Sequence, residues 1–171
     1  MVVELRKLSP SDGMDVYKLL QDIPKNENGF QNGCNGLSYD EYKKWLIRSD
    51  NIASGVGLED WMAPQTIYWL YVDDKPVGMG KLRHRLTDKL KEEGGHCGYA
   101  IASAERQKGY GKLLLNKMID EARGLSIDRL LITVSNHNLP SIKVAVGNGG
   151  IIERTSDVRH YIWIDCHAQQ I

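Results

Sequence analysis

The sequence predicts a mixed α/β fold, in which a central, mostly antiparallel sheet is flanked by about four helices. Three observations carry this prediction. Apolar and polar residues alternate near the N-terminus, two aromatic and β-branched segments flank a tight turn, and a strand, a glycine-containing loop and a helix follow one another later in the chain. The predicted order is strand, two helices, three strands, helix, strand, helix and two strands, so that antiparallel hairpins precede a βαβ-like unit.

The first third of the chain is expected to form one strand and two helices. Residues 2–8 alternate as a half-buried strand does, and residues 9–12 (Ser-Pro-Ser-Asp) are typical of a helix start. Residues 26–36 are rich in asparagine and glycine and should form a loop. Ser38, with Glu41 three residues later, indicates a capping box at the start of the second helix.

The remaining elements follow from their composition and punctuation. Residues 65–73 and 77–86 are expected to pair as a hairpin around a turn rich in aspartate, and the polar residues 87–93 form at most a short helical turn. The later strands are predicted at 95–102, 128–135, 151–155 and 158–164, and the later helices at 109–122 and 138–146.

Composition bounds the class of protein. The 171 residues are expected to form a single domain, residues 1–171, and 22 basic residues balance 22 acidic ones. This balance argues against a general nucleic-acid or membrane-surface binder, and no apolar run approaches the ~20 residues that a membrane span needs. The three cysteines, Cys34, Cys97 and Cys166, form no C-x-x-C pair, so we expect no metal site, no disulfide framework and a reduced, cytoplasmic protein.

The most informative segment is the loop Arg-Gln-Lys-Gly-Tyr-Gly-Lys at residues 106–112. It lies between a predicted strand and a predicted helix, whose first backbone N–H groups favour an anion. Gly109 and Gly111 allow a sharp bend and close approach of a ligand to the backbone. The spacing fits neither a dinucleotide nor a nucleoside triphosphate motif. An ordinary strand-to-helix turn is the alternative interpretation.

The string R-x-x-G-x-G at residues 106–111 resembles the coenzyme A pyrophosphate loop of the GNAT superfamily of N-acetyltransferases. Three further segments are similar to that superfamily: Y-W-L-Y-V-D-D-K-P-V-G-M-G-K-L-R-H-R-L, G-H-C-G-Y-A-I, and L-L-I-T-V-S-N-H-N-L-P-S-I-K-V-A-V-G-N-G-G. Together they resemble a bacterial group of predicted acetyltransferases of undefined substrate. The resemblance covers about residues 65–155, and it implies the GNAT fold with acetyl-CoA as co-substrate.

The resemblance also implies which residues bind the coenzyme. The backbone of Tyr99, Ala100 and Ile101 would pair with the pantetheine arm, and Asn138, followed by Ser141, would contact coenzyme A. An N-cap of the following helix is the alternative or additional role of Asn138. The loop residues implied in binding are Arg106, Gln107, Lys108, Gly109, Tyr110, Gly111 and Lys112.

The catalytic groups are less well defined. The family's tyrosine near the sulfur is replaced by Ala145, so the candidates that remain are His96 as a base and Tyr99 or Ser141 near the leaving thiolate. His84 is a second candidate base, and both histidines could equally be structural. Arg83 and Arg85 share one strand face, which either meets the acceptor or is solvated. Glu105 is expected to be a surface charge.

The predicted function is transfer of an acetyl group from acetyl-CoA to a primary amine of a small molecule or peptide, by direct transfer in a ternary complex. A non-catalytic acyl-CoA-binding module and a nucleotide-binding regulatory domain are the alternatives. The acceptor surface is expected in residues 26–37, residues 52–63 and the turn near Asp157. We expect no nucleic-acid or membrane partner, and either a monomer or a homodimer.

Overall fold

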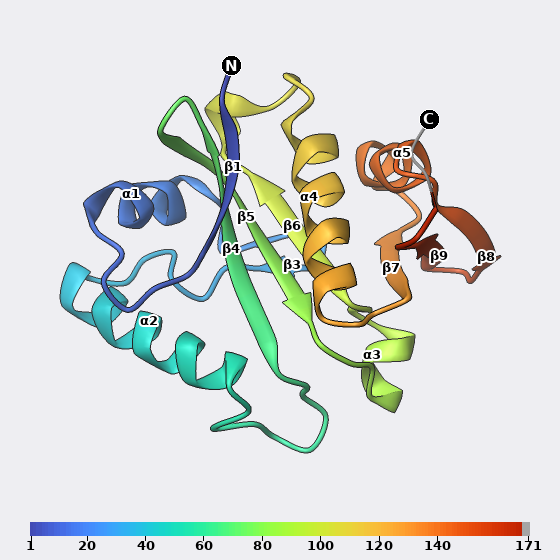
Figure 1. Ribbon diagram of the computed structural model, residues 1–171, viewed down its shortest axis with the longest axis horizontal. Helices are drawn as coiled ribbons and strands as arrows, with labels where there is room; N and C mark the ends of the chain where they lie inside the picture. Colours follow the sequence, from blue (N-terminus) through green and yellow to red (C-terminus); the bar gives the residue numbers. More distant parts are fainter. Residues whose placement is uncertain (169–171) are drawn as a thin grey trace.

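The computed structural model describes residues 1–168, and its elements follow the predicted order (Figure 1). The elements are β1 (Val3–Lys7), α1 (Met14–Asp22), β2 (Asn26–Glu27), β3 (Phe30–Gln31), α2 (Tyr39–Ala53), β4 (Gln65–Val72), β5 (Lys75–Arg83), α3 (Asp88–Glu92), β6 (Cys97–Ile101), the 3-10 helix η1 (Ser103–Glu105), α4 (Tyr110–Gly124), β7 (Arg129–Ser135), α5 (Leu139–Gly147), β8 (Ile151–Thr155) and β9 (Arg159–Asp165). The described part of the chain thus has five α-helices, and the short α3 is the one that the sequence indicated only as a helical turn.

The central sheet is divided into two antiparallel parts. One has the strand order β1-β4-β5-β6, and the other has the order β7-β9-β8. The two parts meet at the start of β6, where the N–H of His96 donates to the carbonyl of Leu131 at 2.8 Å. A Cβ on Gly95 (φ +59°) would collide with that same carbonyl, so this junction requires glycine. Along residues 1–168 no strand pairing joins β6 to β7 beyond the junction.

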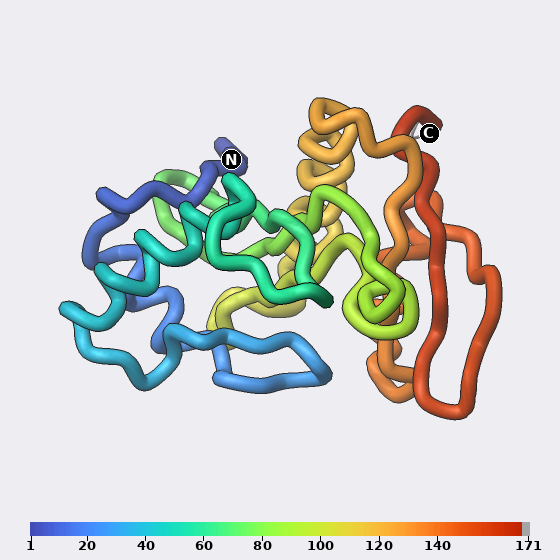
Figure 2. The backbone as a smooth tube through the Cα atoms, turned by 90° about the horizontal axis from the view of Figure 1, so that it is seen from below, coloured from blue at the N-terminus to red at the C-terminus, as the bar shows by residue number. Residues whose placement is uncertain are grey.

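Helices cover both faces of the four-stranded part (Figure 1). Leu114 and Met118 of α4 are fully buried against one face, whereas Tyr42 of α2 and Leu20 of α1 are buried with Trp69 against the other. Figure 2 shows α1 and α2 at one end of the molecule and β8 and β9 at the opposite end. These two cores fix the position of β6, which lies between them at the edge of its sheet.

Local signals in the sequence were confirmed at two of three positions. Ser38 and Glu41 form the predicted capping box of α2. The turn between β4 and β5 has positive φ at both Asp73 and Asp74, as two-residue hairpins require. The helix-start signal at residues 9–12, in contrast, precedes a helix that begins only at Met14, because the Asp12 carboxylate instead accepts hydrogen bonds from Ser9 and from the Trp69 indole.

The loop predicted at residues 26–36 also contains an element that the sequence did not indicate. The two-residue strands β2 and β3 pair as a small hairpin. The buried Asn32 holds the segment in place, because its side-chain amide donates to the carbonyls of Leu20 and Ile23 at 2.7 and 2.9 Å. The hairpin is thereby held against the end of α1.

All three cysteines are buried free thiols, and burial raises the pKa of Cys97 to about 12. Among residues 1–168, no three His, Cys, Asp or Glu side chains are arranged to hold a metal ion. None of the helices in this part of the chain is long and apolar enough to cross a membrane.

Candidate active site

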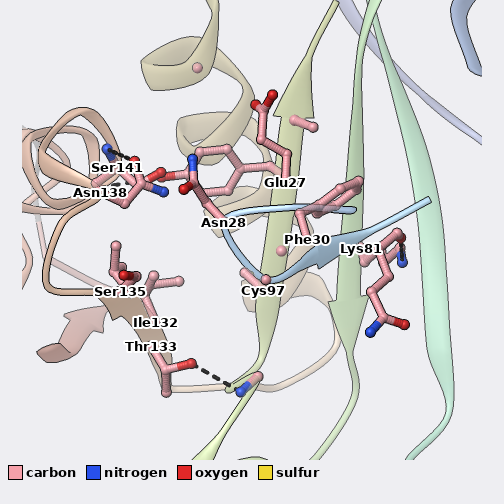
Figure 3. A pocket seen from close by; sticks show the side chains of 18 of the residues that line it. Glu27, Asn28, Phe30, Lys81, Cys97, Ile132, Thr133, Ser135, Asn138 and Ser141 are labelled. Atoms are coloured by element: carbon pink, nitrogen blue, oxygen red, sulfur yellow. Dashed lines mark hydrogen bonds between the residues drawn. The ribbon is translucent and has the colours of Figure 1, made fainter. Parts of the chain in front are cut away.

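A cleft of about 1120 Å³ opens where β6 and β7 separate. Its walls are the β2–β3 hairpin, β6, the start of α4, β7 and the start of α5. Figure 3 shows Asn138 and Ser141 on one side of β6, and Phe30 and Lys81 on the other. The volume exceeds the ~300–1,000 Å³ of an ordinary ligand pocket, so it has room for two reactants side by side.

The loop before α4 forms one end of the cleft. Gln107 and Gly109 have φ values of +62° and +82°, and this left-handed backbone turns the chain sharply into the helix. A Cβ on Gly109 would meet no other atom within 4 Å, so the backbone here is open to a ligand. The free amides of the first turn of α4 therefore border the cleft and suit the pyrophosphate of a coenzyme.

The basic side chains of this loop are only partly available. The Arg106 guanidinium binds Glu27 of the hairpin at 2.7 Å and the Ile101 carbonyl at 3.1 Å. Lys108 binds Glu105 at 2.8 Å. Lys112 also lines the cleft, and no carboxylate in residues 1–168 lies within ion-pair distance of it.

The expectation that Glu105 is a surface charge was wrong. Glu105 is 8% exposed, and its carboxylate accepts hydrogen bonds from both Lys108 and Lys75. These hydrogen bonds lower the pKa of the Glu105 carboxyl. Glu105 thus ties the loop to the start of β5 and fixes the position of the candidate phosphate site.

The structure brings Tyr99, Asn138 and Ser141 together at the middle of the cleft. The Tyr99 hydroxyl donates to the Ser141 carbonyl at 3.5 Å, and the Asn138 side chain caps α5 by accepting from the Ser141 N–H at 3.4 Å. Burial raises the pKa of Tyr99 to about 12, so the phenol is protonated at neutral pH. Ala145 is fully buried one turn further along α5.

The two histidines lie elsewhere. His96 is 6% exposed, its Nδ1 accepts from the Leu131 N–H at 2.9 Å, and burial lowers its pKa to about 4. His84 binds the Thr66 hydroxyl at 2.7 Å. Neither of them lines the cleft. The His96 contact supports the junction of the two sheet parts, and the His84 contact supports the β4–β5 pairing. We therefore propose structural roles for both histidines and no catalytic role.

Parts of the three segments in which the acceptor surface was expected also line the cleft. Residues 27–31, residues 61–63 and Val158 with Arg159 all line it. Of the two arginines predicted to share a face, Arg83 lines the cleft whereas Arg85 is exposed outside it.

Sequence reasoning missed Lys81. Its side chain lies 4.8 Å from the centre of the Phe30 ring and donates to the Gln31 carbonyl. The signal was present in the alternation of β5, because Lys81 is two residues from Arg83 and must share its face. The covering hairpin had no such signal, since residues 26–36 are characteristic only of a loop.

Comparison with known families gives this cleft a context. The family model described as the acetyltransferase (GNAT) family matches residues 33–147, which is more than half of the chain. The chain therefore belongs to the GNAT family of acetyltransferases. No curated protein matches the sequence significantly.

Solved structures agree on the fold. A GNAT-family acetyltransferase from Streptococcus pneumoniae is 16% identical, with a TM-score of 0.64 over 96% of this chain and 99% of that one. Campylobacter jejuni N-acetyltransferase PseH, in complex with acetyl coenzyme A, is 14% identical with a TM-score of 0.63 over the same shares. The ribosomal-protein-S5-alanine acetyltransferase of Vibrio fischeri is 15% identical, with a TM-score of 0.68 over 96% of this chain and 93% of that one.

Proposed function

We propose that this protein transfers the acetyl group of acetyl-CoA directly to a primary amine of a small molecule or peptide. The observation that carries the proposal is the free edge of β6. This strand pairs with β5 along one edge, and along the other edge it faces the cleft beside the loop that precedes α4. An extended arm with amide groups can bind such an edge as an added strand would, while its phosphates reach the helix start.

The residues proposed to bind the coenzyme divide into three groups. The backbone of Tyr99, Ala100 and Ile101 would hold the pantetheine arm. The amides of residues 107–112, with Lys112, would hold the pyrophosphate. Asn138 and Ser141 border the space between the two. All of these residues except Lys108, which is turned to Glu105, line the cleft, and this supports the assignment.

Tyr99 is the best-placed proton donor for the leaving thiolate. Its hydroxyl lies in the cleft, stays protonated at neutral pH, and donates a long hydrogen bond of 3.5 Å to the Ser141 carbonyl. A hydroxyl so weakly engaged is free to turn toward a sulfur atom beside it. Acetyl-CoA, when bound, supplies the activated acyl group and a thiol leaving group.

One specific observation favours a second function, a non-catalytic acyl-CoA-binding module. The position at which the family has a tyrosine is the fully buried Ala145, which offers no proton. Such a module would bind acetyl-CoA without turning it over.

Steady-state release of free coenzyme A thiol separates the two functions. Purified protein is mixed with acetyl-CoA and a broad panel of primary amines, and thiol release is recorded with and without each amine. The proposal predicts continuous, amine-dependent release, with the acetylated amine identified by mass spectrometry. Binding of acetyl-CoA with no release for any amine would favour the module.

A further inference from the structure

We propose, on the basis of the acetyltransferase function above, that the acceptor is an amine that also carries an anionic group, a carboxylate or a phosphate. Lys81 and Arg83 would bind this anion at the end of the cleft away from the coenzyme loop. This assignment narrows the substrate class, which neither the family nor the similar structures specify.

The two cations are placed together by β5. They are separated by the buried Leu82, so their side chains leave the same face of the sheet, with about 7 Å between their Cα atoms. Lys81 pairs with Gly98 of β6, next to Tyr99. The backbone N–H of Arg83 donates to the His96 carbonyl at 2.7 Å, at the junction where the cleft closes. Both side chains line the cleft.

Neither cation has a carboxylate partner in residues 1–168. Arg83 donates to the carbonyls of Gly94 and Gly95 at 3.0 and 3.2 Å. The Lys81 ammonium donates to the Gln31 carbonyl and lies against the Phe30 ring. Burial lowers the pKa of both groups, that of Lys81 to about 8. Both side chains are partly buried, and a partly buried cation without a counter-charge loses solvation that a ligand anion would offset.

The carboxylates that line the cleft do not supply the missing charge, because each already has a basic partner. Glu27 binds Arg106, and Glu93 lies 3.6 Å from Arg159. Glu105 is held by Lys75 and Lys108. The acceptor end therefore keeps an excess of positive charge, which attracts an anion and disfavours an acceptor that carries only amines.

The test compares amines in pairs that differ only in the anion. β-Alanine is paired with β-alaninamide, and O-phosphoethanolamine with ethanolamine, so that the two pairs distinguish a carboxylate from a phosphate. Binding of each compound in the presence of coenzyme A is measured by saturation-transfer NMR, and kcat/KM is measured with acetyl-CoA. The variants are Lys81→Met and Arg83→Lys, with Arg85→Met, an exposed arginine two residues beyond the end of β5 and outside the cleft, as the control.

We expect the wild-type protein to favour one anionic member by about tenfold or more, as a charge-assisted contact allows. Lys81→Met should abolish this preference, and Arg85→Met should retain it. Arg83→Lys keeps the positive charge but loses the guanidinium hydrogen bonds to the carbonyls of Gly94 and Gly95. It should therefore weaken the preference for the anionic compound only in part. Acetyl-CoA affinity should be the same in all four proteins.

The proposal is overturned if the neutral member of each pair binds equally well, if no anionic member binds, or if Lys81→Met keeps the preference. These outcomes leave the acetyltransferase function standing as long as acetyl-CoA binds and some amine is acetylated. Failure of the function itself would instead appear as absence of acetyl-CoA binding in the wild-type protein.

Discussion

Glu27 binds Arg106 at 2.7 Å, and this ion pair joins the β2–β3 hairpin to the loop that precedes α4. One partner covers the acceptor end of the cleft, and the other belongs to the candidate coenzyme site. The pair is 40% exposed on each side, so its own contribution to stability is small. The ion pair matters for coenzyme binding instead, because the Glu27 carboxylate holds the Arg106 guanidinium, which would otherwise be free to bind a phosphate.

Glu27→Gln should therefore strengthen acetyl-CoA binding. The substitution frees Arg106 and removes a negative charge from the edge of the cleft, which should lower Kd roughly two- to fivefold, as expected for an exposed pair. Calorimetric titration at two salt concentrations checks this. Asp120→Asn, which removes the exposed partner of Arg123 on α4, is the control and should change nothing. Weaker binding in Glu27→Gln would show that the pair supports the site.

Gly111→Val should weaken coenzyme binding while the fold is retained. A Cβ at residue 111 meets only Val144, at an ordinary 3.7 Å, so the protein can accommodate it, whereas a ligand at the start of α4 cannot approach as closely. We expect a loss of about tenfold or more in affinity, ~1.4 kcal/mol. Gly124→Val, at the other end of the same helix and free of contacts, is the matched control. A folded Gly111→Val variant with wild-type affinity would refute the placement of the site.

Tyr99→Phe should lower kcat and leave acetyl-CoA affinity unchanged. The lost hydroxyl donates a long hydrogen bond of 3.5 Å to the Ser141 carbonyl, so its removal costs little stability, but the proposed proton donor disappears. Because a coenzyme A thiolate is a good leaving group, we expect a loss of about tenfold, below the usual range for general acids. Steady-state kinetics and titration measure the two quantities separately. An unchanged kcat would assign proton donation to water.

Glu105→Gln should destabilise the protein at neutral pH by about 1 kcal/mol, because two cations lose their shared partner. Hydrogen bonds from Lys108 and Lys75 lower the pKa of Glu105 in the folded state. Its contribution is therefore complete above the unfolded pKa of about 4.3 and is lost as pH falls through the lower folded value.

Urea unfolding at pH 7 and at about pH 3 checks this dependence. The difference in the free energy of unfolding between the wild-type protein and Glu105→Gln should be smaller at the lower pH. Asp88→Asn, a fully exposed carboxylate 3.8 Å from Lys91, should show a much smaller effect at both values. A difference that does not change with pH would mean that the ion pairs are not its origin.

Local chemistry made much of this fold predictable. The Ser38–Glu41 capping box, the aspartate turn between β4 and β5, and the cap that Asn138 provides for α5 are each encoded within four residues. The loop at residues 106–112 could be recognised because glycine spacing and the adjoining strand and helix restrict its conformation. These signals were sufficient to identify the family, and they are the basis on which we propose the coenzyme end of the cleft.

The features that were missed depend on contacts between distant segments. The β2–β3 hairpin is held by Asn32 bonding to the end of α1, and the burial of Glu105 depends on Lys75, thirty positions away. The sequence left His96 open as a base or a structural residue, and its hydrogen bond to Leu131 at the junction favours the structural role. Side-chain pairings of this kind leave no periodic trace in the sequence.

Calorimetric titration of the purified protein with acetyl-CoA, with NAD and ATP as controls, measures directly whether the cleft binds this coenzyme. We expect selective binding of acetyl-CoA with a micromolar Kd, because the extended arm and the pyrophosphate of acetyl-CoA match the free edge of β6 and the start of α4. Absence of acetyl-CoA binding, or equal or tighter binding of NAD or ATP, would contradict it.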